Sequence, residues 1–556
     1  MQRALNRLAD ETFDVVVIGG GVYGLSTAWA AALRGLRVAL VERGDFGAAT
    51  SSGSLKLIHG GLRYLQHLDF VRMRISIRER RLMLRLAPHL VHPLAFVVPC
   101  YGYGIRGPEA MGAAMLANDV ISADRNLGQP DPDRRIPNGK LLKPAQCLQY
   151  LPRIPAAGLR GAALFYDAQM HSSERLSLAF GLSAAAEGAA LANYAEATGF
   201  EYASDGSLAV VKVRDTLGGA EFAVRGKVFV NMTGPWCDIL LHRLRSPETD
   251  RTVRRSKGIQ LIVRPLSEGV AFGVETRQKD KTALIARGGR SFFVTPWRGA
   301  SIIGTTDTLY EGDPDGYGVS EAEIADFLRE FNEAWPAAEL RRADVQYWCG
   351  GLRPLGDVDA DPDHVKASHK YEFIDHARRG GPANLISVVG VKYTVCRAIA
   401  EQAAAAAAGK LGGTVRPGRT AEARLHGGDI DDFAGFERAA LARPGADPAV
   451  TRHLAQLYGT AMDGVLKLAA SAPALGEKIA GSAEVLRAEV VRAVREEMAL
   501  KLSDVVLRRT DLGTLGHPGR PALEDAAALM GAELGWSDEH RNAEIAELEA
   551  VYRPAP

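Results

Sequence analysis

The chain has 556 residues, which is too long for a single hydrophobic core, so two or three domains are expected. Hydrophobic residues make up 47% of the sequence and charged residues 24%, the balance of a soluble globular protein. The 67 Lys and Arg residues nearly cancel the 66 Asp and Glu residues, for a formal net charge of +1. A protein that binds the nucleic-acid backbone usually carries a basic excess, so no nucleic-acid partner is expected.

The N-terminus and the cysteines favour a reducing, cytoplasmic location. The first residues lack the apolar run of a secretory signal. The uncharged run 15–33 is long enough for a membrane span, but its glycines fit a strand, a turn and a helix better. Without a C-x-x-C pair, a disulfide framework, a zinc site or an iron–sulfur cluster is not expected. The five cysteines are Cys100, Cys147, Cys237, Cys349 and Cys396.

A compact strand–helix–strand unit is predicted at the start of the chain. Phe13–Ile18 is typical of a buried strand, and Leu25–Arg34 of a helix that follows a glycine-rich turn. Arg37–Val41 predicts a second buried strand, which is followed directly by Glu42. This order is that of a dinucleotide-binding unit.

The turn carries the pattern G-x-G-x-x-G at Gly19, Gly21 and Gly24. The first glycine permits a tight turn, the second lets the backbone approach a pyrophosphate, and the third allows close helix–strand packing. The start of the following helix then presents free N–H groups to the phosphates. Glu42 is placed to accept the ribose hydroxyls of an adenosine. These residues predict dinucleotide binding but do not separate FAD from NAD.

The rest of the chain divides into a strand-rich middle and a helical end. A further buried strand, Leu385–Val389, leads into an alanine-rich helix at Ile399–Ala408. After about Gly413 helical patterns dominate, as in Val450–Tyr458 and Ser482–Leu507. The middle predicts a mixed or antiparallel sheet. Its clearest strands are Leu208–Val213, Lys227–Asn231, Gln260–Val263, Ser291–Thr295 and Ser301–Gly304.

Several stretches in order resemble the FAD-dependent glycerol-3-phosphate dehydrogenases, a branch of the D-amino-acid-oxidase-like flavoproteins. They are FDVVVIGGGVYG, ATSSGSLKLIHGGLRYL, VNMTGPW, FFVTPW, SIIGTTDT, GGLRPL and VVGVKYT, which together cover most of residues 13–400. RHLAQLYG and VLRRTDLG resemble the C-terminal domain of the same family.

The resemblance implies an α/β fold. A Rossmann-like FAD-binding domain is joined to a substrate domain with a mixed or antiparallel sheet and to a helical C-terminal domain. Residues 1–413 are then one oxidoreductase unit, and 414–556 are the helical domain. Within the unit, the FAD-binding part is expected at about 13–95, 155–240 and 350–413, and the substrate part at about 96–154 and 241–349.

The resemblance also implies FAD as cofactor and oxidation of sn-glycerol 3-phosphate to dihydroxyacetone phosphate, with hydride passing from C2 to flavin N5. The expected substrate-binding residues are Arg63, Tyr64, Arg353 and Lys392. The expected cofactor-binding residues are Gly19, Gly21, Gly24, Glu42, Thr50, Ser51, Ser52, His59, Gly60, Gly61, Gly234, Lys392 and Thr394.

The expected catalytic residues are His59, Arg353 and Lys392. His59 is the candidate base, because its unperturbed pKa of about 6.5 suits proton abstraction near neutral pH. Arg353 and Lys392 are the candidate phosphate clamp: two cations in one small pocket would repel each other unless an anion lies between them. The candidate catalytic and substrate-binding residues also have structural alternatives. His59 also fits a loop-holding hydrogen bond, and Arg63 a surface ion pair.

Departures from the family pattern leave the substrate open. Gln260 stands where many family members carry a histidine, and it cannot act as a base. Val395 and Cys396 replace the usual threonine and tyrosine. A related polyol phosphate such as an erythritol phosphate stays an alternative. An amine or amino-acid oxidase and a non-catalytic flavoprotein are weaker ones.

The sequence does not determine the electron acceptor or the oligomeric state. Family dehydrogenases commonly pass electrons to quinone from the inner face of the cytoplasmic membrane, so a quinone acceptor and peripheral membrane association are expected. Residues 105–121, with Met111, Met115 and Leu116, fit either contact with a bilayer or packing inside the protein. Oxygen stays open as acceptor, and a homodimer as the oligomeric state.

Overall fold

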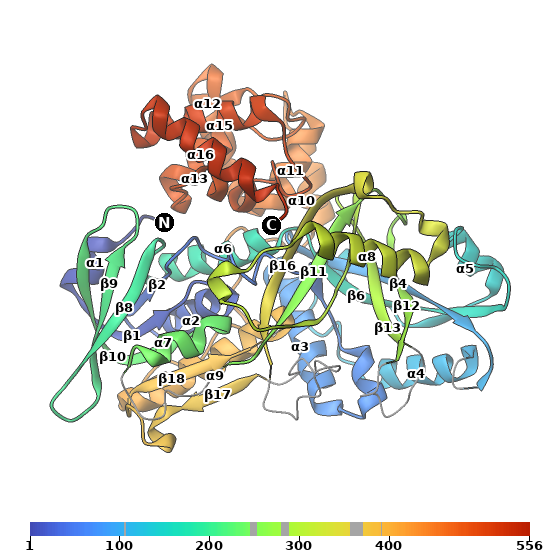
Figure 1. Cartoon of the computed structure of the whole chain (residues 1–556), viewed down its shortest axis with the longest axis horizontal. Helices are drawn as coiled ribbons and strands as arrows, with labels where there is room; N and C mark the ends of the chain where they lie inside the picture. Colours follow the sequence, from blue (N-terminus) through green and yellow to red (C-terminus); the bar gives the residue numbers. More distant parts are fainter. Residues whose placement is uncertain (105–106, 245–252, 280–288, 356–370, 391, 556) are drawn as a thin grey trace.

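The computed structural model describes the whole chain except residues 105–106, 245–252, 280–288, 356–370, 391 and 556. Figure 1 shows two β-sheets with their helices and a separate group of helices, coloured orange to red, that lies against both. This arrangement confirms the predicted α/β class, with its Rossmann-like part, its second sheet and its helical C-terminal domain.

The first sheet is parallel at its centre. Its strands are β1 (Thr12–Ile18), β2 (Val38–Val41), β7 (Ala190–Ala192), β8 (Ala195–Tyr202), β9 (Leu208–Asp215), β10 (Glu221–Asn231), β17 (Glu372–Asp375) and β18 (Leu385–Val389). They follow the order β17-β18-β10-β1-β2-β7, and β9 pairs with β10 and with β8. Strand β1 pairs in parallel with both β10 and β2, as expected for a dinucleotide-binding sheet.

Helices cover both faces of this sheet because its central strands are apolar on both sides. One face packs against α2 (Val22–Leu33), α6 (Ser173–Ala186) and α9 (Cys396–Leu411). The other face packs against α1 (Leu5–Asp10) and α7 (Cys237–His242). Almost every residue of α2 is buried, which explains the long uncharged run in the sequence.

The second sheet is mixed. Its strands are β3 (Leu57–Ile58), β4 (Val91–Tyr101), β5 (Lys140–Leu142), β6 (Leu159–Met170), β11 (Arg255–Val263), β12 (Val270–Lys279), β13 (Gly289–Trp297), β14 (Ala300–Gly304), β15 (Thr308–Tyr310) and β16 (Val345–Pro354). Strands β12 and β4 pair in parallel, and the other pairs are antiparallel. Helix α8 (Glu321–Ala334) packs on this sheet through Phe327 and Phe331, beside Phe292 of β13.

The division between the two sheets differs from the expected segment limits. The segment 155–240 was expected in the FAD-binding part, yet it begins with β6, which pairs with β4 over most of its length. Likewise β16, which ends inside the expected segment 350–413, pairs with β11. Strand β6 is mostly buried and β16 is mostly half-buried, and composition alone does not tell which partner such a strand chooses.

The C-terminal region is helical, and none of the named strands lies in it. Its helices are α10 (Phe433–Leu441), α11 (Pro448–Tyr458), α12 (Met462–Ser471), α13 (Arg487–Glu497), α14 (Leu502–Asp504), α15 (Arg520–Leu534) and α16 (Asp538–Val551). The predicted helical stretch Ser482–Leu507 is interrupted. Met498 adopts a left-handed conformation that ends α13, and a short π-helix (Val505–Arg509) follows α14.

Helix α4 (Pro108–Ile121) has one side packed inside the protein and another side exposed, and only the packing alternative is tested by the structure. Met111 and Met115 are buried against Phe96 and Phe165 of the second sheet. Leu116, in contrast, is exposed. No helix in the described part of the chain combines the length and the apolar character that crossing a bilayer requires.

Candidate active site

A single large cavity connects the glycine-rich turn to the second sheet. Its volume is about 1720 Å³, well above the roughly 300–1,000 Å³ of a common ligand pocket. It begins at the first turn of α2 and the end of β2 and extends to β4, β6, β12 and β13. The cavity therefore has room for a large cofactor together with a small substrate.

The glycines of the turn hold backbone positions that a larger residue would disturb. Gly19 has φ +105°, in the region that favours glycine. A Cβ on Gly24 would lie 1.8 Å from the carbonyl oxygen of Gly19, so the helix can approach the strand only without a side chain. Gly21 is the N-cap of α2 and lines the cavity beside Val22 and Tyr23. The helix N-terminus thus opens on the cavity, as pyrophosphate binding requires.

Glu42 lies at the same end, where β2 finishes. Its carboxylate accepts hydrogen bonds from the backbone N–H of Gly20 at 2.6 Å and of Gly44 at 2.8 Å. Burial raises the pKa of Glu42, against the effect of these two donors. Each oxygen retains a lone pair, and the residue lines the cavity, so Glu42 fits a pair of ribose hydroxyls.

The loop 49–54 connects this end to the second sheet. Ser51 Oγ accepts a hydrogen bond from Val22 N, and Thr50 Oγ1 donates one to Leu352 O, both within 3.0 Å. Ser52 does not line the cavity, because its hydroxyl turns back to the carbonyls of Ala48 and Ala49. Gly234, with φ +56°, also lines the cavity.

Lys392 and Tyr64 meet at the other end of the cavity. The ammonium group of Lys392 donates to the hydroxyl of Tyr64 and lies 4.3 Å from the centre of its ring. Burial lowers the pKa of Lys392 from its ordinary value to about 8. Among the described residues, no carboxylate forms an ion pair with Lys392, so this cation can receive an anionic ligand.

Arg353 has a partner that the sequence analysis missed. Its Nη2 lies 2.9 Å from Oδ1 of Asp307 and donates to the Thr306 carbonyl at 3.1 Å. Arg353 is therefore already neutralised, and repulsion between Arg353 and Lys392 does not by itself require a bound anion. Its Nε makes no hydrogen bond to any described residue. Asp307 stands in the stretch SIIGTTDT, which was noted only as a resemblance.

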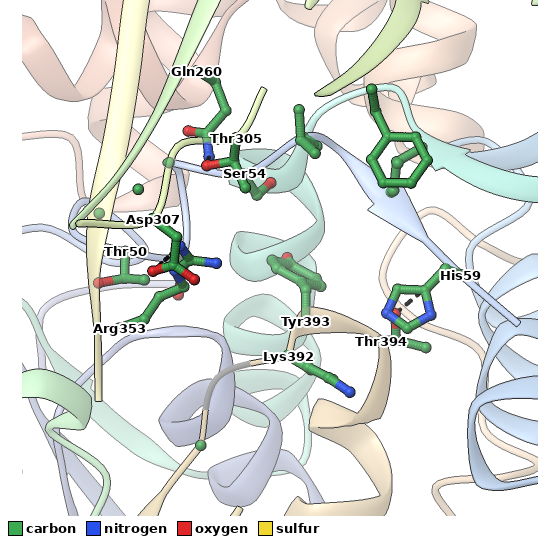
Figure 2. Close-up of a pocket in the computed structure, with 18 of the residues that line it drawn as sticks. Thr50, Ser54, His59, Gln260, Thr305, Asp307, Arg353, Lys392, Tyr393 and Thr394 are labelled. Atoms are coloured by element: carbon green, nitrogen blue, oxygen red, sulfur yellow. Dashed lines mark hydrogen bonds and ion pairs between the residues drawn. The ribbon is translucent and has the colours of Figure 1, made fainter. Parts of the chain in front are cut away.

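Figure 2 shows how these groups are arranged. Arg353 and Asp307 lie on one side of the pocket, His59 and Thr394 on the other, and Lys392 between them in this view. The backbone N–H of His59 donates to Thr394 Oγ1 at 3.2 Å. The imidazole makes an edge contact with the Tyr64 ring, with 6.1 Å between ring centres. His59, Tyr64 and Lys392 therefore form one continuous group.

The glycines after His59 differ in their roles. Gly61 has φ +80° and lines the cavity, whereas Gly60 does not. The N–H of Gly60 donates to Asp167 Oδ1 at 2.5 Å, and Asp167 also forms a buried ion pair with Arg80. Asp167, on β6, therefore holds the loop that carries His59. Arg63 lines the cavity but is exposed to solvent.

Gln260 is fixed by protein groups at both ends of its amide. Its Nε2 donates to Thr305 Oγ1 at 2.9 Å, and the Cys349 thiol donates to its Oε1 at 3.7 Å. It lines the cavity as part of the wall. An amide cannot take up a proton at neutral pH, so Gln260 is excluded as the base. His59 stays the candidate base among the residues that line the cavity.

The fold and the cavity are those of an FAD-dependent oxidoreductase. Residues 14–406 match the model of the FAD dependent oxidoreductase family, and residues 418–541 match the C-terminal domain of alpha-glycerophosphate oxidase. FAD is the cofactor of this family, and Gly19, Gly24 and Glu42 fit its dinucleotide.

Individual relatives narrow the family. The chain is 34% identical to the glycerol-3-phosphate dehydrogenase of Synechocystis sp., over 98% of this chain and 97% of the relative. It is 32% identical to the human mitochondrial glycerol-3-phosphate dehydrogenase, over 96% of this chain and 72% of the relative. The crystal structure of the Bacillus halodurans glycerol-3-phosphate dehydrogenase complexed with FAD superimposes with a TM-score of 0.74 at 26% identity, covering 99% and 96% of the chains. The chain belongs to the FAD-dependent glycerol-3-phosphate dehydrogenase family.

Proposed function

We propose that the enzyme oxidises sn-glycerol 3-phosphate to dihydroxyacetone phosphate. The observation that carries this proposal is the group of Lys392, Tyr64 and His59 in the cavity that begins at the dinucleotide turn. FAD, when bound, supplies the acceptor for the hydride that leaves C2 of the substrate. The names of the relatives support the same substrate.

Lys392 and Arg353 bind the phosphate in this proposal. With a pKa of about 8, Lys392 is mostly protonated at pH 7, and a phosphate dianion beside it favours the charged form further. Asp307 holds the Arg353 guanidinium through Nη2, and the residue lines the cavity, where its other N–H groups can donate to a phosphate. Arg63 and Tyr64 complete the substrate contacts.

His59 accepts the proton of the C2 hydroxyl in this proposal. Thr394 accepts a hydrogen bond from its backbone N–H, and Asp167 from the N–H of the next residue, so the backbone that carries the imidazole is fixed at two consecutive positions. The Lys392 charge nearby stabilises the alkoxide character that develops as the proton leaves.

Anaerobic bleaching of the bound flavin tests the proposal. We expect fast loss of the yellow colour with sn-glycerol 3-phosphate and negligible loss with glycerol. Equal rates for the two compounds would show that the cavity does not select for phosphate. Glycine or another amino acid is the control for an amine-oxidase activity, and it should leave the flavin oxidised.

A four-carbon polyol phosphate is the second candidate substrate. Gln260 favours it, because the amide can hydrogen-bond an additional hydroxyl if it gives up its contact with Thr305. In the same assay, faster bleaching by an erythritol phosphate than by glycerol 3-phosphate would establish this alternative and leave the phosphate clamp intact.

We further propose that the electrons pass to a membrane quinone. Exposed apolar side chains cluster on two neighbouring helices, α4 and α3 (Phe70–Leu86), on the side of the molecule opposite the C-terminal domain (Figure 1). Arg74 of α3 joins the two helices through the Ile121 carbonyl at 2.6 Å and an ion pair with Asp124. We call this surface the apolar patch; it consists of Leu68, Phe70, Val71, Ile75, Leu116 and Val120.

The charge and position of the apolar patch favour a bilayer as its partner. Val71 is 73% exposed and Val120 69%. Arg78 lies exposed on the same helix as Val71, and a cation beside an apolar surface suits anionic lipid. On the inner side of α4, Met111 and Met115 line the cavity itself. The patch would therefore bring the active-site cavity close to a quinone dissolved in the membrane.

Flotation with vesicles tests the membrane proposal. The parent enzyme should float with vesicles that contain anionic phospholipid, and a Val71→Glu/Val120→Glu variant should remain in the dense fraction with its flavin reduction by substrate intact. Leu217→Glu, at an exposed apolar residue on the turn between β9 and β10, is the matched control and should float. Equal flotation of all three proteins would place the membrane contact elsewhere.

A further inference from the structure

The segment that carries Glu42 is held from outside its own domain. Asp45, three residues beyond Glu42, is 3% exposed. Arg509 donates two hydrogen bonds to the Asp45 carboxylate, from Nη1 at 2.6 Å and from Nη2 at 2.7 Å. Arg508 adds a third from Nε at 2.5 Å. Both arginines belong to the short π-helix of the C-terminal domain, in the stretch VLRRTDLG, which neither the fold nor the reaction has so far explained.

A second carboxylate completes the cluster. Asp504 accepts hydrogen bonds from Arg508 Nη2 and from the hydroxyl of Tyr194, each at 2.6 Å. Asn193 donates to Asp45 and also to the Met498 carbonyl of the C-terminal domain. Two buried carboxylates thus face two guanidinium groups. Burial alone would raise the pKa of Asp45, but Arg509 and Arg508 outweigh it and hold the pKa below its ordinary value.

The cluster is connected directly to the backbone around Glu42. Tyr194 N donates to the Gly44 carbonyl at 2.9 Å, and Ala195 N donates to the Glu42 carbonyl at 2.7 Å. Gly44 N in turn donates to the Glu42 carboxylate. A shift of Asp45 or Tyr194 would therefore move both the backbone and the carboxylate of Glu42.

We propose that Arg508 and Arg509 are positioning residues for the cofactor: by holding Asp45 they fix the Glu42 carboxylate, so that docking of the C-terminal domain and binding of FAD are coupled. The coupling is reciprocal by thermodynamic necessity, since whatever strengthens one of two linked equilibria strengthens the other equally. The proposal rests on FAD as cofactor but not on the identity of the substrate.

A second ion pair between the same domains provides a control. It distinguishes positioning of Glu42 from a general contribution to holding the domains together. Arg298, on the turn between β13 and β14, pairs with Asp511 at 3.1 Å, and both side chains are largely buried. This pair joins the C-terminal domain to the second sheet and makes no contact with the segment around Glu42. Arg298→Gln is therefore the matched control for Asp45→Asn.

Titration of the apoenzyme with FAD is the main test. Asp45→Asn should raise the Kd of FAD by about tenfold or more, as expected when hydrogen bonds to a charged group are lost. Arg298→Gln should change it by less than about threefold, within the roughly 0.3–0.5 kcal/mol expected between independent sites, because Arg298 pairs with Asp511 and not with the segment around Glu42. Similar weakening by both variants would mean that the ion pairs only hold the domains together, and would overturn the proposal.

A double-substitution experiment tests whether the Asp45 cluster affects FAD binding through Glu42. In a Glu42→Gln background, Asp45→Asn should weaken FAD by less than about threefold, since residues that act through one contact are not additive. Full additivity of the two substitutions would contradict the positioning role.

Hydrogen exchange covers the case in which Asp45→Asn does not fold. In the parent, FAD should slow amide exchange in residues 502–511 of the C-terminal domain. Tyr194→Phe removes one hydroxyl from the cluster and should reduce this protection. Exchange in 502–511 that does not respond to FAD in the parent would refute the coupling. None of these measurements contains substrate, so their failure and the failure of the proposed reaction are distinguishable.

Discussion

The two ends of the cavity are built in different ways. At the dinucleotide end, consecutive residues of one strand–turn–helix unit supply the backbone shape, and Gly19 and Gly24 work because they have no side chains. At the substrate end, side chains from distant segments meet, as in the contacts of Lys392 with Tyr64 and of Arg353 with Asp307. The comparison teaches that the dinucleotide end is shaped mainly by local backbone geometry, whereas the proposed substrate end is assembled from side chains that are distant in the sequence.

A branched residue at Gly21 should have the largest effect, because it fills the dinucleotide end. Gly21 has φ −70°, which any residue adopts, and a Cβ there meets only Ser51 Oγ at 3.2 Å. Gly21→Val should therefore fold but lose FAD, since its methyl groups project where the pyrophosphate approaches. The absorbance of the purified protein near 450 nm, read with its circular dichroism, measures both. Gly409→Ala, in a helix with open space around it, is the control and should stay yellow. A folded Gly21→Val protein with full flavin content would show that the backbone does not hold the cofactor there.

Removal of the base at the substrate end should come next in size. His59→Ala should slow flavin reduction at saturating substrate by about 10²–10⁴, the usual contribution of a general base. Substrate affinity should change much less, which stopped-flow measurements over a range of substrate concentrations can separate. Gln260→Leu is the comparison, because Gln260 lines the same cavity without a proton-accepting group; its rate should fall by less than about tenfold, as for the loss of one neutral hydrogen bond. A larger loss at Gln260 than at His59 would contradict the assignment of His59 as the base.

Loss of the ribose contact should weaken the cofactor by a smaller amount. Glu42→Ala should reduce FAD affinity by about 1.5–3 kcal/mol, the range for hydrogen bonds to a charged group. Turnover at saturating FAD should be nearly unchanged, because Glu42 takes no part in proton or hydride transfer in our proposal. Equilibrium titration of the apoenzyme provides the Kd. An affinity within about twofold of the parent, far below that range, would mean that Glu42 serves the backbone of Gly20 and Gly44 alone.

The pH dependence of substrate capture should show the smallest effect. Burial holds the pKa of Lys392 at about 8, so its charge is progressively lost as the pH rises through this value. Because binding of the phosphate dianion needs that charge, kcat/KM for glycerol 3-phosphate should fall as the pH rises through about 8, toward tenfold per pH unit. Lys392→Arg keeps its charge across this range and should remove the fall. The same alkaline fall in Lys392→Arg would assign the ionisation to another group.

The difference between the two ends also explains what could be predicted from the sequence. The unit from Phe13 to Glu42 is contiguous, so its strands, its turn and its ribose carboxylate follow from local pattern. Asp167 reaches Gly60 from 107 residues away, and Arg509 reaches Asp45 from 464 residues away. No local pattern encodes such contacts, and a single sequence does not show which acidic residue will meet which arginine.

The expected cofactor loop shows the limit of motif transfer within one stretch. Thr50, Ser51, His59 and Gly61 line the cavity, but Ser52 and Gly60 do not. The hydroxyl of Ser52 and the amide of Gly60 are used inside the protein, where they shape the loop. Neighbouring residues of one motif can thus have opposite orientations, and only the folded backbone decides which of them reaches a ligand.

The most direct test of the central claim measures four rates of anaerobic flavin reduction, for the parent and Arg353→Ala, each with glycerol 3-phosphate and with glycerol. If side chains bind the phosphate, Arg353→Ala should lower the apparent second-order rate constant for glycerol 3-phosphate by a factor equivalent to about 1.5–3 kcal/mol or more of transition-state stabilisation. The rate constant for glycerol should fall much less. Selectivity for the phosphate should therefore collapse in the variant. If the variant instead lost the same factor with both compounds, Arg353 would not contact the phosphate, and the proposed clamp would be wrong.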